Sequence, residues 1–344
     1  MIHDAPLLIA CANSPARKPV YDTMQKLLIY IFMALLAAQN SRAQAVDNNG
    51  IERNINKESC IRLNYGNDYF TATDYYLTQS ILLELTHPAL KKNPVTLILL
   101  QPATWQVKYG LAAEHNGYTP TDYVPAHILY GDRPFAGTLS LKSFTIATDT
   151  FHKQRWASAL SIGVIGPWAG AGDMQTYIHE HTPNALPQGW PNQVANDLLL
   201  NYQLSYEKQV LQLGQYGHIS ATASAKAGTV TTKVNGGLTF MAGLFNNPYA
   251  SFRIRNKRIQ LYIYDHPEIN FVAYDATLQG GLFNKQSPYT LTSSEISRAV
   301  FRNNWGIVAK LGNVYLEYYQ SYMTKEFQTG LEMRNGGIQI GVGL

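Results

Sequence analysis

Apolar and polar residues alternate along many segments of this chain. In residues 61–66, with the sequence IRLNYG, the Ile, Leu and Tyr fall on one face of an extended chain and the Arg, Asn and Gly on the other. The same period of two recurs in LLLNYQLSYEK (198–208), GHISATASAKAG (217–228) and GGIQIGVGL (336–344). Successive side chains of a β-strand point to opposite faces. These segments therefore predict strands with one apolar and one polar face.

The whole pattern predicts twelve strands. They lie near residues 61–70, 75–87, 104–114, 138–149, 156–166, 198–211, 217–227, 230–243, 259–275, 299–311, 314–325 and 337–344. The ninth contains Pro267 and could be divided into two strands. We interpret it as one long strand bent at this proline, because an even number of strands places both termini on the same side of a bacterial barrel.

The strand pattern favours an all-β transmembrane antiparallel barrel. Beyond residue 45 no run of 18 apolar residues occurs, as a membrane-spanning helix would require. In such a barrel the outer faces meet lipid and the lumen is polar. A soluble β-sandwich with one solvated face is the alternative. The 23 tyrosines, which suit aromatic girdles at the membrane surfaces, favour the barrel.

The order of the strands predicts where the connections lie. With both termini in the periplasm, short turns such as 311–313 are periplasmic, and we expect long connections to be extracellular. We assign residues 88–103, 115–137, 167–197 and 276–298 to this outer side. The third of these connections predicts a short helix from Met174 to His181, with Asp173 as N-cap and Pro183 beyond its end.

The N-terminal region has the features of an export signal. Residues 24–45, MQKLLIYIFMALLAAQNSRAQA, combine a basic start, a short apolar run and a small-x-small end, which predicts a signal peptide. Residues 1–23 then correspond to upstream translation from a misassigned start. Residues 46–344 form the predicted single barrel domain, in the outer membrane of a Gram-negative bacterium.

Composition narrows the possible partners. The net charge of the 344 residues is +4, and part of it belongs to the predicted leader, so no nucleic-acid partner is indicated. The two cysteines, Cys11 and Cys60, form neither a metal motif nor a disulfide framework. Residues predicted to face the lumen include both signs of charge, namely Arg62, Glu207, Lys226 and Glu317. We expect them to fill the lumen with ion pairs, which argues against an open pore.

Five separated blocks carry a family resemblance. They are NDYFTATDYYLT (67–78), YGDRPFAGTL (130–139), SIGVIGPWAGAGDMQTYIHE (161–180), QGWPNQVAND (188–197) and EYYQSYMTKEF (317–327). In this order they resemble the outer-membrane lipid A 3-O-deacylases of the LpxR type. The resemblance covers essentially the whole chain after the leader. The family pattern has Asn-Gly after the threonine of the first block, whereas this chain has Gln79-Ser80.

The resemblance implies a fold and a reaction. Members are twelve-stranded outer-membrane barrels that remove the 3′-linked acyloxyacyl group of lipid A by calcium-dependent ester hydrolysis. Their site lies outside the lumen, between the barrel wall and a helix of an extracellular loop. The matching positions here are Asn67, Asp68, Thr78 and His179. Asn67 occupies a position where the first strand would otherwise place an apolar residue, as expected if this wall carries the site.

The residue types suit such a hydrolysis. His179 is the candidate base that activates water, because a neutral imidazole accepts protons near neutral pH. Asp68, with Asn67, supplies the oxygen ligands that Ca²⁺ prefers. Thr78 is expected to orient a ligand or water. Backbone N–H groups of the glycine-rich bend 166–172 could complete an oxyanion hole.

Two structural expectations accompany this assignment. Regular pleating places Asn67 and Asp68 on opposite faces, and gives Thr78 the face of Tyr76 and Ser80. One site therefore requires a strand end or a bulge, which we place at Gly66. In addition, Asp132 and Arg133 are expected to form a supporting ion pair at the barrel rim.

Two other functions fit the same sequence. An outer-membrane phospholipase would apply the same histidine and calcium chemistry to glycerophospholipids. A non-enzymatic barrel, either a small porin or a surface scaffold whose loops bind partners, would need no catalytic residues. The oligomeric state and the acyl chain that is cleaved do not follow from the sequence.

Overall fold

The computed structural model describes residues 48–73, 75–252 and 257–344. These residues belong to one compact unit, residues 41–344. The predicted leader, residues 1–45, lies outside the described residues. No helix in the described part of the chain is both long and apolar enough to cross a membrane.

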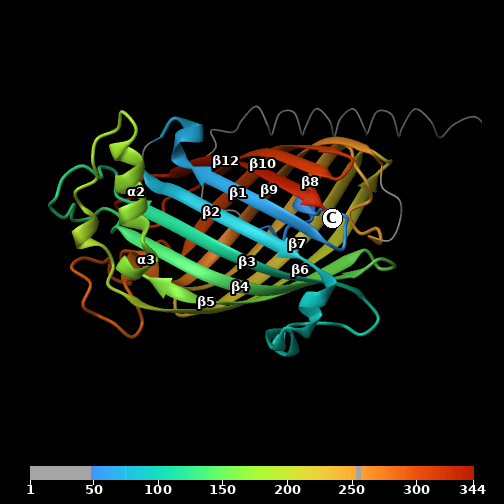
Figure 1. Cartoon of the computed structure of the whole chain (residues 1–344), viewed down its shortest axis with the longest axis horizontal. Coiled ribbons are helices and arrows are strands. Elements are labelled where there is room, and N and C mark those ends of the chain that lie inside the picture. Colours follow the sequence, from blue (N-terminus) through green and yellow to red (C-terminus); the bar gives the residue numbers. More distant parts are fainter. Residues whose placement is uncertain (1–47, 74, 253–256) are drawn as a thin grey trace, which may run out of the picture. The chain divides into compact units, whose positions relative to one another are not determined.

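Twelve strands of the described chain close into an antiparallel barrel (Figure 1). Each strand pairs with its neighbours in sequence, and β1 pairs with β12. The strands are β1 (Cys60–Asn67), β2 (Tyr76–Thr86), β3 (Gln106–Thr119), β4 (Ala136–Asp149), β5 (Gln154–Ile165), β6 (Asp197–Leu213), β7 (Gly217–Gly228), β8 (Thr231–Leu244), β9 (Ile259–Asp275), β10 (Ala299–Leu311), β11 (Val314–Met323) and β12 (Met333–Gly343). The predicted fold and strand number are confirmed.

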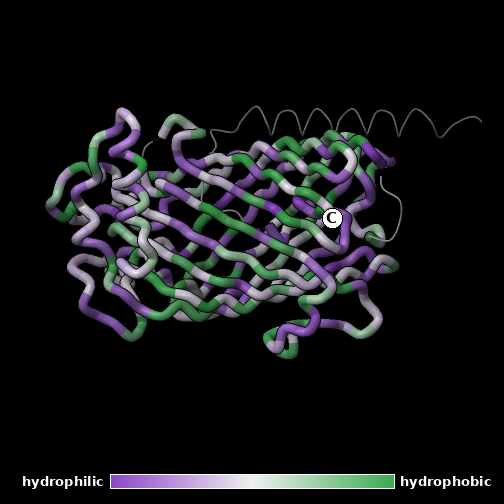
Figure 2. Tube along the Cα trace, in the orientation of Figure 1, coloured by the Kyte–Doolittle hydropathy of each residue, from purple (hydrophilic) through white to green (hydrophobic). Residues whose placement is uncertain are grey.

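The alternation of side chains separates two environments. Along β1, Ile61, Leu63 and Tyr65 are exposed on the outer surface, whereas Arg62 and Asn64 are buried in the lumen. Figure 2 shows the same alternation of apolar and polar positions on the other strands. An apolar outer wall and a polar interior are what a lipid environment imposes on a closed sheet.

The ninth strand is continuous, as predicted. On one side Pro267 faces Asn303 of β10 within an uninterrupted ladder. On the other side the pairing with β8 is interrupted between Asp265 and Glu268. Proline has no N–H to donate to a ladder, so the strand passes through Pro267 with one side left unpaired.

The lumen is filled at one end by the chain itself. We call the end where β1 begins and β12 ends the terminal end, and the opposite end the loop end. Residues 48–55, which include the 3₁₀-helix η1 (Ile51–Arg53), lie inside the terminal end and form a plug. The Arg53 Nε donates to Glu317 Oε1 at 2.8 Å, and the Tyr262 hydroxyl donates to the carbonyl of Glu52 at 2.7 Å.

Ion pairs fill much of the remaining lumen. Arg62 pairs with Glu84, and Arg155 pairs with Glu207. The expectation of an ion-paired interior therefore holds for Arg62, Glu207 and Glu317, but Lys226 forms no ion pair within the described chain. Plug and ion pairs together occupy space that an open pore would need, which disfavours the porin alternative.

At the loop end an apolar cluster joins the barrel rim to the loops. It includes Tyr76, Leu77 and Tyr118 of the wall, together with Leu278 of the short helix α3 (Ala276–Gln279) and Phe327 of the β11–β12 connection. The turn between β10 and β11 lies at the terminal end and uses Gly312 at a φ of 62°. The predicted short turn at 311–313 is thus confirmed.

One predicted loop position is wrong. Residues 87–105 connect β2 to β3 at the terminal end, opposite to the other three long connections (Figure 1). Antiparallel strands alternate in direction, and β2 runs from the loop end to the terminal end. The connection that follows β2 must therefore lie at the terminal end. The expected extracellular position of 88–103 overlooked this alternation.

This connection folds back along the outer wall. It contains the 3₁₀-helices η3 (Pro88–Lys92) and η4 (Pro94–Ile98). The backbone at Leu100 accepts from Thr145 Oγ1 and donates to Ser158 Oγ, and the Ile98 carbonyl accepts from the Tyr202 hydroxyl. Polar side chains of the outer wall are thereby covered, while Leu97 is 84% exposed. The connection replaces a polar wall surface by an apolar one.

Candidate active site

A bulge in β2 positions Thr78. The register of β2 against β3 shifts between Leu77 and Gln79, so that Thr78 and Gln79 both oppose Gly117. A Cβ at Gly117 would lie 3.1 Å from both of these side chains, so the glycine makes room for the extra residue. The predicted irregularity exists, but it lies at Thr78 rather than at Gly66, which pairs regularly with both neighbouring strands.

The bulge changes the face on which Thr78 lies. The Oγ1 of Thr78 accepts from Gln175 Nε2 at 2.9 Å, and the adjacent Gln79 Nε2 contacts the carbonyl of Ala171 at 3.5 Å. Both partners belong to the loop helix α2 (Ala171–Glu180) outside the barrel. Thr78 therefore faces outward with Gln79, and the expected shared face with Ser80, which is buried and donates to Asn116 Oδ1, is wrong. Tyr76 has a φ of 74°, a strained conformation of the kind that clusters at functional sites.

Asn67 ends β1 and is directly connected to this bulge. Its side chain accepts from Tyr69 N at 2.7 Å, which caps the 3₁₀-helix η2 (Asp68–Thr71). Its Nδ2 donates to the carbonyl of Thr78. By the alternation of β1, Asn67 lies on the same outer face as Tyr65. The amide thus holds the ends of β1 and β2 together at the outer wall.

Asp68 begins η2 and is buried. Its carbonyl accepts from Thr71 Oγ1 at 2.8 Å and from Thr73 Oγ1 at 3.2 Å. The strand ends at Asn67, so Asp68 lies outside the regular pleat of β1. The strand end at Asn67 and the bulge at Thr78 together bring these two residues to the same place on the outer wall.

The helix α2 carries His179 on its buried face. Ala171, Gln175 and His179 are spaced by four residues and are the buried members of the helix. Its first residue is Ala171 and its N-cap is Gly170, so the predicted start at Met174 with Asp173 as N-cap is wrong. The helix lies against β3 and β4, close to the wall, because a Cβ on Gly137 would be only 2.8 Å from that of Ala171.

The imidazole of His179 has a defined orientation. Its Nδ1 lies 2.6 Å from the carbonyl of Ala185, and its ring packs edge-on against Tyr123 at 5.2 Å between centroids. A carbonyl oxygen can only accept, so Nδ1 carries a proton. In the neutral ring Nε2 is then left as an acceptor, which makes no hydrogen bond within the described chain.

The structure brings some of the candidate residues together and leaves one apart. Asn67 and Thr78 are hydrogen-bonded, and Gln175 joins Thr78 to α2. His179 lies one helical turn beyond Gln175, about 6 Å along the axis. Among the described residues it forms no hydrogen bond to Asn67, Asp68 or Thr78. A substrate group or water would have to occupy the space between them.

The glycine-rich bend does not offer the expected row of free donors. The N–H groups of Gly166, Trp168, Ala169 and Gly170 all donate to protein acceptors, and Pro167 has none. The N–H groups at the first residues of α2, Ala171 and Gly172, are what the bend leaves for an anion. An oxyanion hole built from the whole segment 166–172 is therefore ruled out by its own hydrogen bonds.

The side chains of Asp132 and Arg133 form no ion pair with each other among the described residues, although the backbone N–H of Arg133 donates to Asp132 Oδ1 at 2.6 Å. Arg133 is buried, forms an ion pair with Glu326, donates to Thr277 Oγ1 at 2.7 Å and lies 4.4 Å from the ring centroid of Tyr118. Burial alone would lower the pKa of Arg133, but the nearby Glu326, Asp275 and Tyr118 side chains together outweigh it, so the pKa is raised. Asp132 instead accepts from Thr121 N at 2.8 Å. These residues fasten the loops to the rim, and the expected ion pair is corrected.

Sequence reasoning missed four residues of this region. Gln175 connects Thr78 to Trp190, whose Nε1 donates to Gln175 Oε1 at 2.7 Å. His115 of β3 lies under the bend, with Nε2 3.0 Å from the carbonyl of Ala169 and with Nδ1 buried and unpaired among the described residues. Gln79 is the fourth. Gln175 precedes His179 by four residues, and this helical spacing was the available signal.

The region offers oxygen donors for a hard cation. Asn67 and Thr78 contribute amide, hydroxyl and carbonyl oxygens at the outer wall, and the adjacent Asp68 is the nearest carboxylate in the sequence. These are the ligand types that Ca²⁺ prefers. No group of three or more His, Cys, Asp or Glu that could hold a metal occurs in the part of the chain that the structure describes. The donor set fits Ca²⁺ in its chemistry.

Comparison with known proteins places the chain. The sequence profile of the family "Outer membrane protein LpxR" matches residues 27–342. LpxR from Salmonella typhimurium aligns with a TM-score of 0.68 at 17% identity, over 83% of this chain and 100% of that one. The β domain of the Bordetella autotransporter BrkA aligns less well, with a TM-score of 0.44 and 8% identity over 83% and 98% of the two chains. No curated protein matches the chain.

The Salmonella protein shares the fold, and the family match extends over nearly the whole sequence. The outer-membrane location follows from the family and from the closed barrel with its apolar outer wall. This chain belongs to the LpxR family of outer-membrane proteins.

Proposed function

We propose that this protein hydrolyses an ester of lipid A in the outer leaflet and releases the 3′-linked acyloxyacyl chain. The main support is the position of Asn67, Thr78 and the His179-bearing helix on the outer face of the wall, at the loop end. Strand residues next to this region, including Leu83 and Leu139, are exposed and apolar. An acyl chain lying along the wall would bring its ester to the site without entering the lumen.

The chain's own residues have distinct roles in this proposal. His179 accepts a proton from water through Nε2, while the Ala185 carbonyl holds Nδ1 and fixes the tautomer. Gln175 donates to Thr78 Oγ1, so the threonine hydroxyl proton can point to a ligand or water. Asn67 fixes the backbone of the bulge. Trp190 fixes Gln175 in turn.

Calcium is part of the proposal. Asp68, with Asn67, would hold Ca²⁺ through oxygen ligands, and Ca²⁺ would polarise the ester carbonyl and stabilise negative charge on its oxygen. Most N–H groups of the bend already donate to protein acceptors, so the bend leaves few donors for an oxyanion. A bound cation would therefore supply much of the positive charge that stabilises it.

Mass spectrometry of lipid A tests the reaction. Detergent-purified protein is incubated with lipid A in Ca²⁺ or in EDTA. We expect loss of the 3′-acyloxyacyl group in Ca²⁺, and a decrease of at least about 100-fold in EDTA, since removing a cation that stabilises charge in the transition state removes several kcal/mol. Intact lipid A in the presence of folded protein and Ca²⁺ would contradict the proposal.

The close contact between wall and helix gives a second test. In Gly137→Ala the new Cβ would lie 2.8 Å from the Cβ of Ala171, which pushes α2 outward and moves His179. A misplacement of about 1 Å can cost about 100-fold in rate. We expect a loss of this order in initial deacylation rate with the barrel still folded. The matched control is Gly236→Ala in β8, where the nearest atom is 3.7 Å away. Equal rates in both variants would show that the wall contact does not position the base.

A glycerophospholipase is the second enzymatic candidate. The same outer-wall site would meet any ester at this depth in the membrane. Running the assay in parallel with phosphatidylethanolamine distinguishes the two functions. Faster cleavage of lipid A supports the deacylase, and faster cleavage of phosphatidylethanolamine supports the phospholipase.

A further inference from the structure

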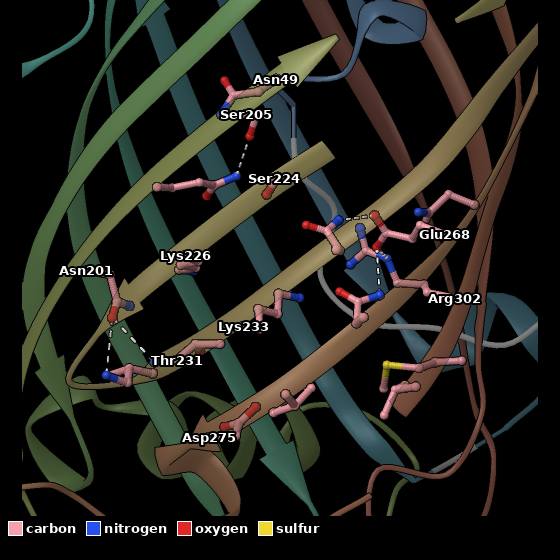
Figure 3. A pocket seen from close by; sticks show the side chains of 18 of the residues that line it. Asn49, Asn201, Ser205, Ser224, Lys226, Thr231, Lys233, Glu268, Asp275 and Arg302 are labelled. Atoms are coloured by element: carbon pink, nitrogen blue, oxygen red, sulfur yellow. Dashed lines mark hydrogen bonds and ion pairs between the residues drawn. The ribbon is translucent and has the colours of Figure 1, made fainter. Parts of the chain in front are cut away.

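Two lysines face each other inside the barrel without acidic partners. Lys226 of β7 and Lys233 of β8 are directly opposite in the register of the two strands, and both line the lumen cavity (Figure 3). Neither forms a hydrogen bond or an ion pair among the described residues. Like charges directly opposite on neighbouring strands are destabilising. Their presence on the inner face calls for a compensating negative charge.

The carboxylates that line the cavity are mostly held by other groups. Glu268 is paired with Arg302 at 2.8 Å and accepts from Asn235. The carboxylates of Glu114, Glu207 and Glu326 pair with Lys142, Arg155 and Arg133, and Glu52 shares Arg53 with Glu317.

One further carboxylate belongs to Asp275, which faces Thr231 across the β8–β9 ladder and accepts from the N–H and hydroxyl of Thr277. It lies within electrostatic range of Lys233 but not at ion-pair distance. Of the carboxylates that line the cavity in the described chain, Asp275 alone has no cation at ion-pair distance, so positive charge exceeds negative charge locally around the two ammonium groups.

The surrounding side chains add neutral donors. Asn201 uses its Oδ1 to accept from the backbone N–H groups of Val230 and Thr231, which leaves its Nδ2 to donate. Ser224 precedes Lys226 by two residues and Thr231 precedes Lys233 by two, so their hydroxyls share the inner face with the lysines. Figure 3 shows Lys226, Lys233, Asn201, Ser224 and Thr231 around one space.

The size of the cavity limits the ligand. Its volume is about 230 Å³, below the range of about 300–1,000 Å³ usual for sites of drug-sized molecules. The plug bounds it at one end through Asn49 and Arg53, and the rim cluster bounds it at the other through Leu278 and Met323. A small anion with several oxygens matches the two ammonium groups, the amide and the hydroxyls.

We propose that the lumen holds a binding site for a phosphate group, with Lys226 and Lys233 as its cationic ligands and Asn201, Ser224 and Thr231 as neutral donors. This site is separate from the outer wall, where Asn67, Thr78 and His179 lie. It stands independently of the proposed hydrolysis, because it rests on the charges of the lumen alone.

Calorimetric titration of the folded, detergent-purified chain tests the site. The probe is inorganic phosphate, and the variants are Lys226→Met, Lys233→Met and the double variant. We expect saturable binding by the unmodified chain, a decrease of at least about tenfold in affinity for each single variant, and loss in the double variant, because each lysine contributes a charge-assisted hydrogen bond. The matched control is Lys208→Met, which removes an exposed lysine of β6 and should leave affinity unchanged.

Two further probes identify the source of the phosphate. Glucosamine 1-phosphate represents a sugar phosphate and glycerol 3-phosphate the headgroup of a lipid, and both are small enough for the cavity. Tighter binding of either than of inorganic phosphate, still dependent on both lysines, supports the site and assigns that source. The proposal is overturned if no probe binds saturably, or if binding persists in the double variant. It is also overturned if the unmodified chain binds no phosphate and the double variant is more stable to urea. That result would mean that the two lysines only repel each other.

Discussion

Replacing His179 with alanine is expected to decrease lipid A deacylation by about 100- to 10,000-fold, the contribution of a positioned general base. The imidazole is buried on the face of α2 that lies against the barrel wall, and its Nδ1 is held by the Ala185 carbonyl. The ring therefore has a single fixed orientation. The barrel does not depend on it, because α2 lies outside the closed sheet. Initial rates by mass spectrometry, with heat-modifiable electrophoretic mobility as a check of folding, measure the effect.

The same helix provides the matched control. His181 follows two residues later, is exposed and contacts the carbonyl of Tyr177 at 2.8 Å. His181→Ala removes an identical side chain without reaching the wall, and we expect activity within about twofold of the unmodified chain. If His179→Ala keeps its activity, the assignment of the base is wrong. His115, the other histidine on this part of the outer wall, would be the next residue to replace.

Replacing Arg133 with methionine is expected to lower the free energy of unfolding by about 3–5 kcal/mol, because it leaves the buried Glu326 carboxylate without its cation. Arg133 also contacts Thr277 of α3 and the ring of Tyr118 in β3, so one side chain joins three loop-end elements to the wall. Urea unfolding in detergent micelles, followed by tryptophan fluorescence, measures the change. Lys325→Met, next to Glu326 but exposed, is the control and should change it by less than about 1 kcal/mol.

A double replacement distinguishes a lost ion pair from lost packing. In Arg133→Met with Glu326→Met both charges are gone, and replacing a buried ion pair by apolar side chains is often neutral or stabilising. We expect the double variant to be more stable than Arg133→Met alone. If the two losses add, the buried charge is not the cause, and the packing of the guanidinium on Tyr118 accounts for the effect.

The architecture of the barrel follows from local features of the sequence. Alternation with a period of two is local, and it located all twelve strands within a few residues, including the continuous strand through Pro267. The same local reasoning identified Asn67 as an exception on an apolar face and found a helix that carries His179 in its last turn. Strand position and face depend on neighbours in sequence, so they can be read from sequence.

The assembly of the candidate site depends instead on contacts between distant segments. The bulge at Thr78 is permitted by Gly117 on another strand, and α2 approaches the wall because Gly137 has no side chain. The partner of Arg133 is Glu326, almost 200 residues away, rather than its neighbour Asp132. That Lys226 and Lys233 form no ion pair among the described residues likewise depends on which acids other strands bring into the lumen. Such outcomes depend on contacts between segments distant in sequence, and a local pattern contains no information about them.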